Sequence, residues 1–298
     1  MYDLKKDTRF LVVGLGLIGG SLAAALTAAG YTVDGLDPDG DAVAYARTAG
    51  YLADGRTAPD CAYLASHDVI LLALYPHILE NWVRENAAAL RPGTLLTDAT
   101  GVKGEMVGRV QAMLPDGVSF IAAHPMAGRE KSGIRYADAA LFRGANFIIT
   151  PTERNTEGEI ALCRSIGRVL GCGRFAVLSP AAHDEMIAFV SQLTHVIAVA
   201  LMTCRDSAEL SDYTGDSFRD LTRIAHINDG MWSELFLLNR TALLAEMDRF
   251  SAQFARLRAA LAEGDREALR AAMRLSTARR DAFDAHHPPK QKPEEVSR

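Results

Sequence analysis

Three glycines between an apolar run and a helical stretch constrain this chain more than any other feature. In "VVGLGLIGGS", Gly14 ends the apolar run 9–14, Gly16 follows it, and Gly19 lies in the first turn of the helical stretch 17–30. The spacing G-x-G-x-x-G between a strand and a helix is typical of a dinucleotide-binding unit. We therefore expect a strand, a tight glycine turn and a helix that together bind a diphosphate.

Each glycine has its own expected role in such a turn. Gly14 permits the sharp bend, Gly16 lets the backbone approach the diphosphate, and Gly19 lets the helix pack close to the strand. The first N–H groups of the helix, including those of Leu17 and Ile18, then face the anion. This combination predicts a cofactor site at the start of the helix.

Asp37 points to the identity of the cofactor. It ends the second strand-like run, 32–37, and follows Gly19 at close to the separation of about 20 residues expected for a ribose-binding acid. A carboxylate at this position accepts hydrogen bonds from the ribose hydroxyls and repels a 2′-phosphate. We therefore expect NAD rather than NADP.

The first 179 residues alternate short apolar runs with longer helical stretches, which is the pattern of βαβ units. Runs such as "VILLAL" show no alternation, so we expect helices on both faces of a parallel sheet. This predicts an α/β, Rossmann-type doubly wound sheet. The expected strands are 9–14, 32–37, 68–75, 94–100, 119–124, 145–150 and 174–179.

The character of the sequence changes after residue 179. Ser179 and Pro180 form a typical helix start, with serine as N-cap and proline in the first turn. The helices that follow carry more apolar residues than one buried stripe needs, which fits either a self-contained bundle or a dimer. We expect helices at 181–204, 230–264 and 265–283, and domains at 1–179 and 180–285 with a disordered tail at 286–298.

Composition excludes several classes of partner. The formal net charge of −5 gives no reason to expect binding to nucleic acid or to an anionic membrane. We see no apolar run near the ~18 residues of a membrane span, and no apolar core at the N-terminus that would make a secretory signal. Four scattered cysteines without a CxxC pair indicate reduced thiols rather than a disulfide frame or a zinc site. We expect a cytoplasmic protein without a metal.

Ligands of a doubly wound sheet bind beyond the carboxyl ends of its strands. Tyr75, Thr100 and His124 lie at the carboxyl ends of expected strands, so we place Tyr75 and Thr100 at the cofactor and His124 beside its nicotinamide. A histidine with a pKa near neutrality is the usual acceptor of a proton while a hydride leaves. The alternative for His124 is a structural histidine bonded to backbone at a strand end.

The helical half supplies a second set of polar residues. Ser191 and His195 are four positions apart and share a helix face, where a buried histidine bonded to serine is the structural alternative. Arg223 follows Arg219 by four positions and Asp220 by three, which also fits a solvated helix face with ion pairs. A substrate carboxylate would instead need a fixed guanidinium.

Taken in order, several segments resemble the prephenate dehydrogenase family, including its arogenate-using members. These segments are "VVGLGLIGGS", "HPMAGREKSG", "SQLTHVIAVAL", "SFRDLTRIA" and "MWSELFLLN". The resemblance implies a Rossmann domain followed by an all-α dimerisation domain that forms a homodimer. It also implies NAD(P)-dependent oxidation of prephenate with loss of the ring carboxylate, which gives 4-hydroxyphenylpyruvate for tyrosine synthesis.

The resemblance also assigns roles to residues. It implies that His124 takes the proton of the ring hydroxyl, and that Arg223 grips a substrate carboxylate in a cleft. It pairs Glu130 with Asp220 as charges that guard the mouth of the pocket. The substrate-pocket positions that it implies are Arg223, His195, Ser191, His183 and Glu130.

Departures from the family pattern leave substrate preference between prephenate and arogenate open. Gly101 stands where relatives often carry a serine, so a hydroxyl contact near His124 is missing or replaced by Thr100, and Thr194 replaces a usual proline. A β-hydroxyacid or imine dehydrogenase would need a catalytic lysine in the helical half, and 181–204 contains none. A non-catalytic NAD-sensing protein would keep the glycines without needing the histidine or the arginine.

Overall fold

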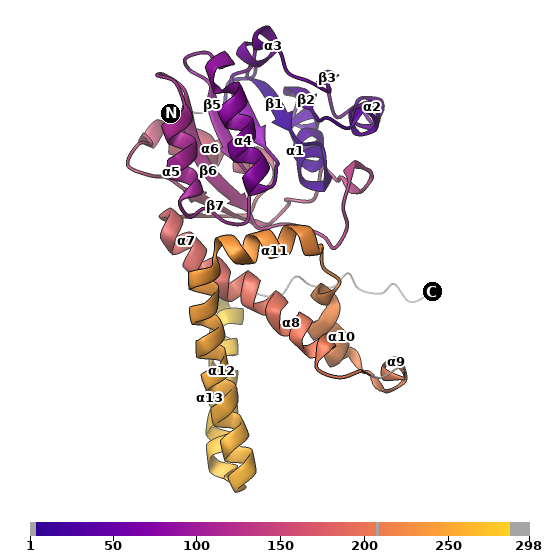
Figure 1. Ribbon diagram of the computed structural model, residues 1–298, viewed down its shortest axis with the longest axis vertical. Helices are drawn as coiled ribbons and strands as arrows, with labels where there is room; N and C mark the ends of the chain where they lie inside the picture. The colour runs from indigo at the N-terminus through magenta and orange to yellow at the C-terminus, as the bar shows by residue number, and fades with distance from the viewer. Residues whose placement is uncertain (1–3, 207–208, 287–298) are drawn as a thin grey trace. The chain divides into compact units, whose positions relative to one another are not determined.

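The computed structural model describes residues 4–206 and 209–286, and its N-terminal half is built on an eight-stranded sheet (Figure 1). The strand order is β3-β2-β1-β4-β5-β6-β7-β8, so the order reverses between β1 and β4. This confirms the predicted Rossmann-type sheet. The strands are β1 Arg9–Val13, β2 Thr32–Leu36, β3 Asp54–Arg56, β4 Val69–Leu72, β5 Leu95–Asp98, β6 Ser119–Pro125, β7 Asn146–Thr150 and β8 Arg174–Val177.

The sheet departs from the sequence prediction in two places. β3 was not expected, because its three residues, "DGR", carry no apolar pattern. β7 pairs antiparallel with β6, while β8 is again parallel to β7. The connection from β6 to β7 holds only the short 3₁₀ turn η2, Ile134–Tyr136, and no α-helix that would carry the chain back for a parallel pairing.

Helices cover both faces of the sheet, as the unbroken apolar strands predict. Two clusters of buried side chains lie on opposite faces of the strands, one against each set of helices. The first set comprises α1 Leu17–Ala28, α2 Gly40–Thr48 and α6 Glu157–Val169, and the second α3 Cys61–Ala65, α4 Pro76–Asn86 with its 3₁₀ extension Ala87–Ala89, and α5 Met106–Met113. Every residue of β4 is buried between them.

Helices alone follow β8 in the described part of the chain. The expected start at Ser179 is confirmed, because its side chain accepts a hydrogen bond from Ala182 N and Pro180 is the first residue of α7. The helices are α7 Pro180–Ile187, a π-helical turn Ala188–Gln192, α8 Leu193–Thr203, α9 Leu210–Tyr213, α10 Asp216–Thr222, the 3₁₀ turn η4 Arg223–Ala225, α11 Asp229–Leu238, α12 Arg240–Glu263 and α13 Arg266–His286.

The prediction of one helix over 230–264 is wrong. The helix is interrupted at Asn239, between α11 and α12. The buried Asn239 side chain donates hydrogen bonds to the carbonyl oxygen of Asp184 and to Gln192 Oε1, at 2.9 and 2.8 Å. A periodicity analysis misses this break because both segments are apolar and the cause is a contact with another helix.

Two compact units divide the chain, Met1–Leu243 and Leu244–Arg298. The first contains the sheet together with α7 to α11, so the expected boundary at residue 179 stays a prediction. The second contains most of α12 and α13, joined through Gly264 at φ +68°. Of the expected tail at 286–298, residues 287–298 lie outside the described residues.

One described stretch is long and apolar enough to cross a membrane by length and composition, contrary to the sequence expectation. It runs over Pro180–Thr203 with a mean hydropathy of 1.8, and 28% of the apolar window is buried. In this structure the stretch is α7, the π-turn and α8, and α8 packs against α10 and η4. Its exposed apolar side chains are Met186, Phe189, Val190 and Met202.

Two alanine substitutions in the glycine turn should separate folding from cofactor binding. A Cβ at Gly19 would lie 1.7 Å from the carbonyl oxygen of Gly14, so Gly19→Ala must push α1 away from β1. We expect a loss of roughly 1–3 kcal/mol in the free energy of unfolding, as overpacking usually costs, measured by urea denaturation.

Gly16→Ala is the matched control, because a Cβ there meets no protein atom within 4 Å. This variant should unfold nearly as the parent does but bind NADH more weakly, because the methyl group occupies the approach to the diphosphate. Equal unfolding curves for Gly19→Ala and the parent would contradict the packing role of Gly19.

Candidate active site

The glycine turn combines tight packing with one open position. Gly14 has φ +88°, and its N–H donates to the carbonyl oxygen of Leu36 at 2.8 Å. Around Gly16 the protein leaves open space, and α1 begins directly after it with Leu17 and Ile18. The first N–H groups of a helix have no partner within the helix. This open corner at a helix N-terminus fits the diphosphate of a dinucleotide.

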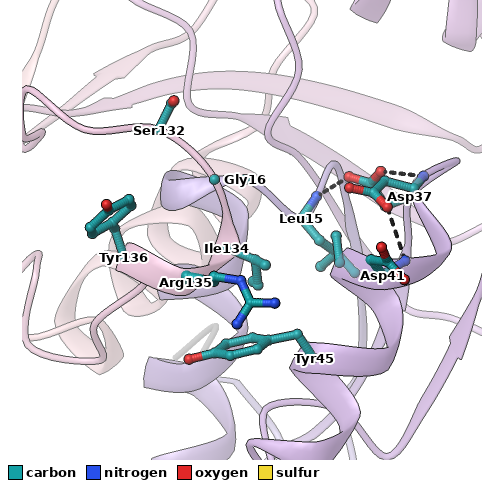
Figure 2. Close-up of a pocket in the computed structure, with 12 residues that line it drawn as sticks. Leu15, Gly16, Asp37, Asp41, Tyr45, Ser132, Ile134, Arg135 and Tyr136 are labelled. Carbon is teal, nitrogen blue, oxygen red and sulfur yellow. Dashed lines mark hydrogen bonds between the residues drawn. The ribbon is translucent and has the colours of Figure 1, made fainter.

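Asp37 lies beside the turn, where the sequence predicts it. Its carboxylate accepts hydrogen bonds from Leu15 N at 2.6 Å and from Asp39 N at 2.8 Å. Both oxygens are thereby fixed at the edge of a cavity of about 410 Å³ that Gly16 also lines (Figure 2). The cavity, the open glycine and the oriented carboxylate together fit NAD, whose adenosine ribose would meet Asp37.

Sequence reasoning missed a cation in the same cavity. Figure 2 shows the Arg135 guanidinium over the ring of Tyr45, and the two are 5.3 Å apart. Arg135 belongs to η2, and this segment is anchored on α1 because Asp138 N donates to Ser21 Oγ at 2.9 Å. Tyr45 and Arg135 are far apart in sequence, so no local pattern brings them together.

His124 lies near the end of β6 in a chain of hydrogen bonds. Its Nδ1 is 3.0 Å from His183 Nε2, and His183 Nδ1 is 2.7 Å from Asp184 Oδ1. Desolvation, followed by the nearby His183 and Lys103, holds the pKa of His124 well below its usual value. His124 is therefore neutral near pH 7 and able to accept a proton.

A buried ion pair lies behind this histidine. Lys103 is fully buried, and its Nζ donates to Asp98 Oδ2 and to the carbonyl oxygen of Ala123, both at 2.6 Å. Desolvation lowers the pKa of Lys103, against the opposing effect of Asp98. Thr100, predicted at the cofactor, is buried in this cluster, and its hydroxyl contacts Asp98 rather than His124. Thr100 therefore does not supply the hydroxyl contact that Gly101 lacks.

Tyr75 lies at the N-terminus of α4, where its hydroxyl is 3.5 Å from Asn228 Nδ2. The next turn is tied to α11 more firmly. Glu234 accepts hydrogen bonds from the backbone N–H of His77 at 2.9 Å and from His77 Nδ1 at 2.7 Å. These contacts hold α11 against the carboxyl-end edge of the sheet, on which His124 also lies.

The face of α11 connects the two sets of predicted residues. The Trp232 ring stacks on His195 with centroids 3.6 Å apart. One turn further, Leu235 lies 3.5 Å from where a Cβ of Gly101 would be, and that Cβ would lie 3.9 Å from His124 Cε1. Trp232 on α11 thus contacts His195, while Leu235 on the same helix lies near the loop residue that neighbours His124.

His195 bonds to Ser191 differently from the structural alternative raised by the sequence. Its Nδ1 donates to the backbone carbonyl of Ser191 at 2.9 Å and not to the hydroxyl. Desolvation lowers the pKa of His195, while the charges of Glu130 and Arg223 act on it in opposite directions. His195 is half-buried, so its Nε2 edge is the one left for a ligand.

Arg223 forms an ion pair with Glu130, in the segment that follows β6. Its side chain is 64% exposed, so it lies at the rim of the site and not deep in a cleft as expected. Asp220 is exposed on α10, and Glu130 pairs with Arg223 instead. Both charges act on His195, so the pair lies near this histidine.

A Rossmann sheet with an NAD-compatible turn, a neutral histidine at a strand end and adjoining helices that carry His195 and Arg223 define an NAD-dependent oxidoreductase. Residues 22–172 match the family model for the prephenate dehydrogenase nucleotide-binding domain, and residues 179–275 match the prephenate dehydrogenase dimerization domain. These matches cover most of the chain. The chain belongs to the prephenate dehydrogenase family.

Individual relatives agree with this membership. Cyclohexadienyl dehydrogenase of Zymomonas mobilis is 30% identical over 285 residues, which cover 93% of this chain and 96% of that protein. Prephenate dehydrogenase of Bacillus subtilis is 27% identical, covering 89% of this chain and 72% of that protein. The Aquifex aeolicus prephenate dehydrogenase, solved with hydroxyphenyl propionate and NAD+, superposes with a TM-score of 0.85 at 27% identity, covering 93% and 98%.

Replacing Asp37 should weaken NADH binding and narrow the preference for NADH over NADPH. Asp37→Ala removes a carboxylate positioned for two ribose hydroxyls, and hydrogen bonds to charged groups contribute about 1.5–3 kcal/mol, so we expect a loss of roughly 10- to 100-fold. Fluorescence titrations with NADH and NADPH measure both affinities. Asp41→Ala, which removes another carboxylate of the same cavity, should change them much less, and equal effects of the two variants would contradict the role of Asp37.

Proposed function

We propose that this chain catalyses the NAD-dependent oxidative decarboxylation of prephenate to 4-hydroxyphenylpyruvate in tyrosine biosynthesis. One observation carries the proposal. His124, a histidine held neutral, lies near the end of β6, at the same carboxyl-end edge of the sheet as the glycine turn. Family membership and the relatives named prephenate and cyclohexadienyl dehydrogenase support the same substrate class.

His124 acts as the general base in this proposal. Bound NAD supplies the hydride acceptor. His124 Nε2 accepts the proton of the ring hydroxyl as the hydride leaves the ring carbon that bears this hydroxyl. The bond to the ring carboxylate then breaks, carbon dioxide leaves, and the electron pair of that bond makes the ring aromatic. The proton returns from His124 to the oxygen, which becomes the phenol, so no net proton is consumed.

Arg223 and His195 bind the substrate side chain. The Arg223–Glu130 pair is exposed, and exposed ion pairs contribute little to stability, so a substrate carboxylate can replace Glu130 at low cost. His195, stacked on Trp232, presents its Nε2 to the same region. Ser191 contributes its backbone carbonyl, which orients His195, and His183 lies behind His124.

We further propose that the protein works as a cytoplasmic homodimer. The match of residues 179–275 to a dimerization domain supports the pairing. Exposed apolar side chains on the helices give such a contact its surface, including Met186, Phe189, Val190, Leu237, Phe250, Phe254 and Leu261. The four cysteines are free thiols, as a reducing compartment favours.

A direct assay tests the activity. Purified protein is mixed with NAD and either prephenate or arogenate, and NADH absorbance is followed together with the product. Formation of NADH and 4-hydroxyphenylpyruvate from prephenate is the expected result. Turnover of arogenate alone would assign the chain to the arogenate-using members, and no turnover of either would overturn the proposal in favour of a binding protein.

His124→Asn should retain NADH binding but lose turnover by about 10²–10⁴-fold, the usual contribution of a general base. The parent should lose kcat/KM as pH falls through the pKa of His124, because only the neutral ring accepts a proton. Since that pKa is held below its usual value of about 6.5, the acidic limb should lie below pH 6.5. The limb should be absent in the variant, and parental turnover in His124→Asn would place the base elsewhere.

Arg223→Ala should raise KM for prephenate by about 10- to 100-fold, as loss of a charged hydrogen bond predicts, with little change in KM for NAD. Arg223→Lys should rescue only in part, because it keeps the charge but loses the fork of donors. Glu130→Gln is the matched control. It removes the competing charge while Arg223 stays, so KM should stay the same or fall. An unchanged KM in Arg223→Ala would leave this arginine with only a surface ion pair.

A further inference from the structure

A buried histidine and a carboxylate stand behind His124 without facing the pocket. The His183 side chain is fully buried, and its two ring nitrogens lie 3.0 Å from His124 Nδ1 and 2.7 Å from Asp184 Oδ1. Both ring nitrogens of His183 are therefore hydrogen-bonded to protein groups. This leaves His183 no free nitrogen for a substrate, in contrast to the pocket role that the resemblance implies for it.

Hydrogen-bond chemistry determines which nitrogen bears the proton in His183 and in His124. Both Asp184 oxygens accept hydrogen bonds from backbone N–H groups, so the Asp184 carboxylate acts as an acceptor and the proton of neutral His183 is on Nδ1. His183 Nε2 is then an acceptor, and His124 Nδ1 must donate to it. Neutral His124 has a single ring proton, so its lone pair is on Nε2, the nitrogen that is free to face the pocket.

We propose that His183 and Asp184 are positioning residues that hold His124 in the tautomer with an unprotonated Nε2. The inference rests on the proposed role of His124 as the base. His183 fixes the plane of the ring and the nitrogen that bears the proton, and Asp184 fixes His183 in turn. When His124 gains its second proton, the same Nδ1–H···Nε2 bond becomes a hydrogen bond from a cation.

Backbone hydrogen bonds hold the Asp184 carboxylate in place. Its carboxylate accepts hydrogen bonds from the backbone N–H groups of Lys103 at 2.9 Å and Gly104 at 2.6 Å. Desolvation and the Lys103 charge lower the pKa of His183 in spite of the adjacent carboxylate, so His183 stays neutral and keeps its acceptor nitrogen. His183 N also donates to the Ser179 carbonyl at 2.9 Å, within the first turn of α7.

No other described side chain takes this role. Gly101, the neighbour of His124 Cε1, has no side chain, and the hydroxyl of Thr100 is directed to Asp98. The Lys103 ammonium donates to Asp98 and to the Ala123 carbonyl. Among the described residues, the hydrogen bond to His183 is therefore the contact that orients the His124 imidazole.

Nitrogen NMR tests the inference without requiring turnover. In protein with ¹⁵N-labelled histidine, two-bond proton–nitrogen correlations show which nitrogen of each ring bears the proton, and His124→Asn identifies the His124 signals. We expect a protonated Nδ1 and an unprotonated Nε2 in the parent at neutral pH. In His183→Ala, we expect a mixture of both tautomers.

Kinetics supply the second readout. His183→Ala should lower kcat by about 10- to 100-fold, as removal of the hydrogen-bond partners of metal-binding histidines typically does, while KM for prephenate and the Kd for NADH change little. His183→Gln, whose amide oxygen can accept from His124 Nδ1, should recover part of the loss. His67→Ala is the matched control, because His67 is equally buried and bonded to Asp34 at 2.9 Å, away from the site. It should lower thermal stability without lowering kcat.

An Nε2–H tautomer of His124 in the parent would overturn the inference, and so would a His183→Ala variant with parental tautomer and parental kcat. If His183→Ala does not fold, the parental spectrum and His183→Gln still decide the question. The proposed function can fail separately. Absence of prephenate turnover with the expected tautomer would reject the substrate and leave the positioning role in place.

Discussion

The buried ion pair between Lys103 and Asp98 holds together the edge of the sheet on which the site is built. Asp98 ends β5, and its second oxygen accepts a hydrogen bond from Ala123 N on β6, at 3.0 Å. Lys103 closes the link by donating to the Ala123 carbonyl, directly before His124. Breaking one partner of such a pair costs about 3–5 kcal/mol, so this edge has little freedom to move.

The loop after β5 that carries Lys103 also joins the sheet to the helical half. The N–H groups of Lys103 and Gly104 bind Asp184 on α7, and Asp184 binds His183. The Lys103 charge, held inside the protein, also disfavours a proton on either histidine. One buried cation thus fixes the geometry of His124 and keeps it neutral, which are the two properties that a base needs.

Local sequence patterns predicted the features that depend on local chemistry. The glycine turn, Asp37 at the end of β2 and the Ser179 cap each follow from a few adjacent residues, and the structure places them as expected. Strand-end position brought His124 into consideration, and helical spacing brought His195 and Arg223. The family resemblance assigned their roles, but neither source predicted their contacts. That Arg223 lies at an exposed rim with Glu130 depends on how η4 meets the segment after β6.

Apart from the short strand β3, the missed features depend on contacts between segments that are distant in the sequence. Arg135 reaches the cofactor cavity because η2 packs on α1, and the helix break at Asn239 satisfies groups on α7 and the π-turn. Lys103 reads as an ordinary surface lysine in "GVKGE", since lysine is rarely fully buried unless paired. A search for lysines close to an acidic strand end is the one sequence signal that would have found it.

A crystal structure of this protein with NAD+ and hydroxyphenyl propionate, the ligands of the Aquifex aeolicus structure, would test the roles of His124 and Arg223 together. We expect the phenol oxygen within hydrogen-bond distance of His124 Nε2, with His124 Nδ1 still bonded to His183, and the propionate carboxylate at Arg223. A phenol oxygen bound to His195 instead, or a His124 ring turned away from His183, would contradict these roles.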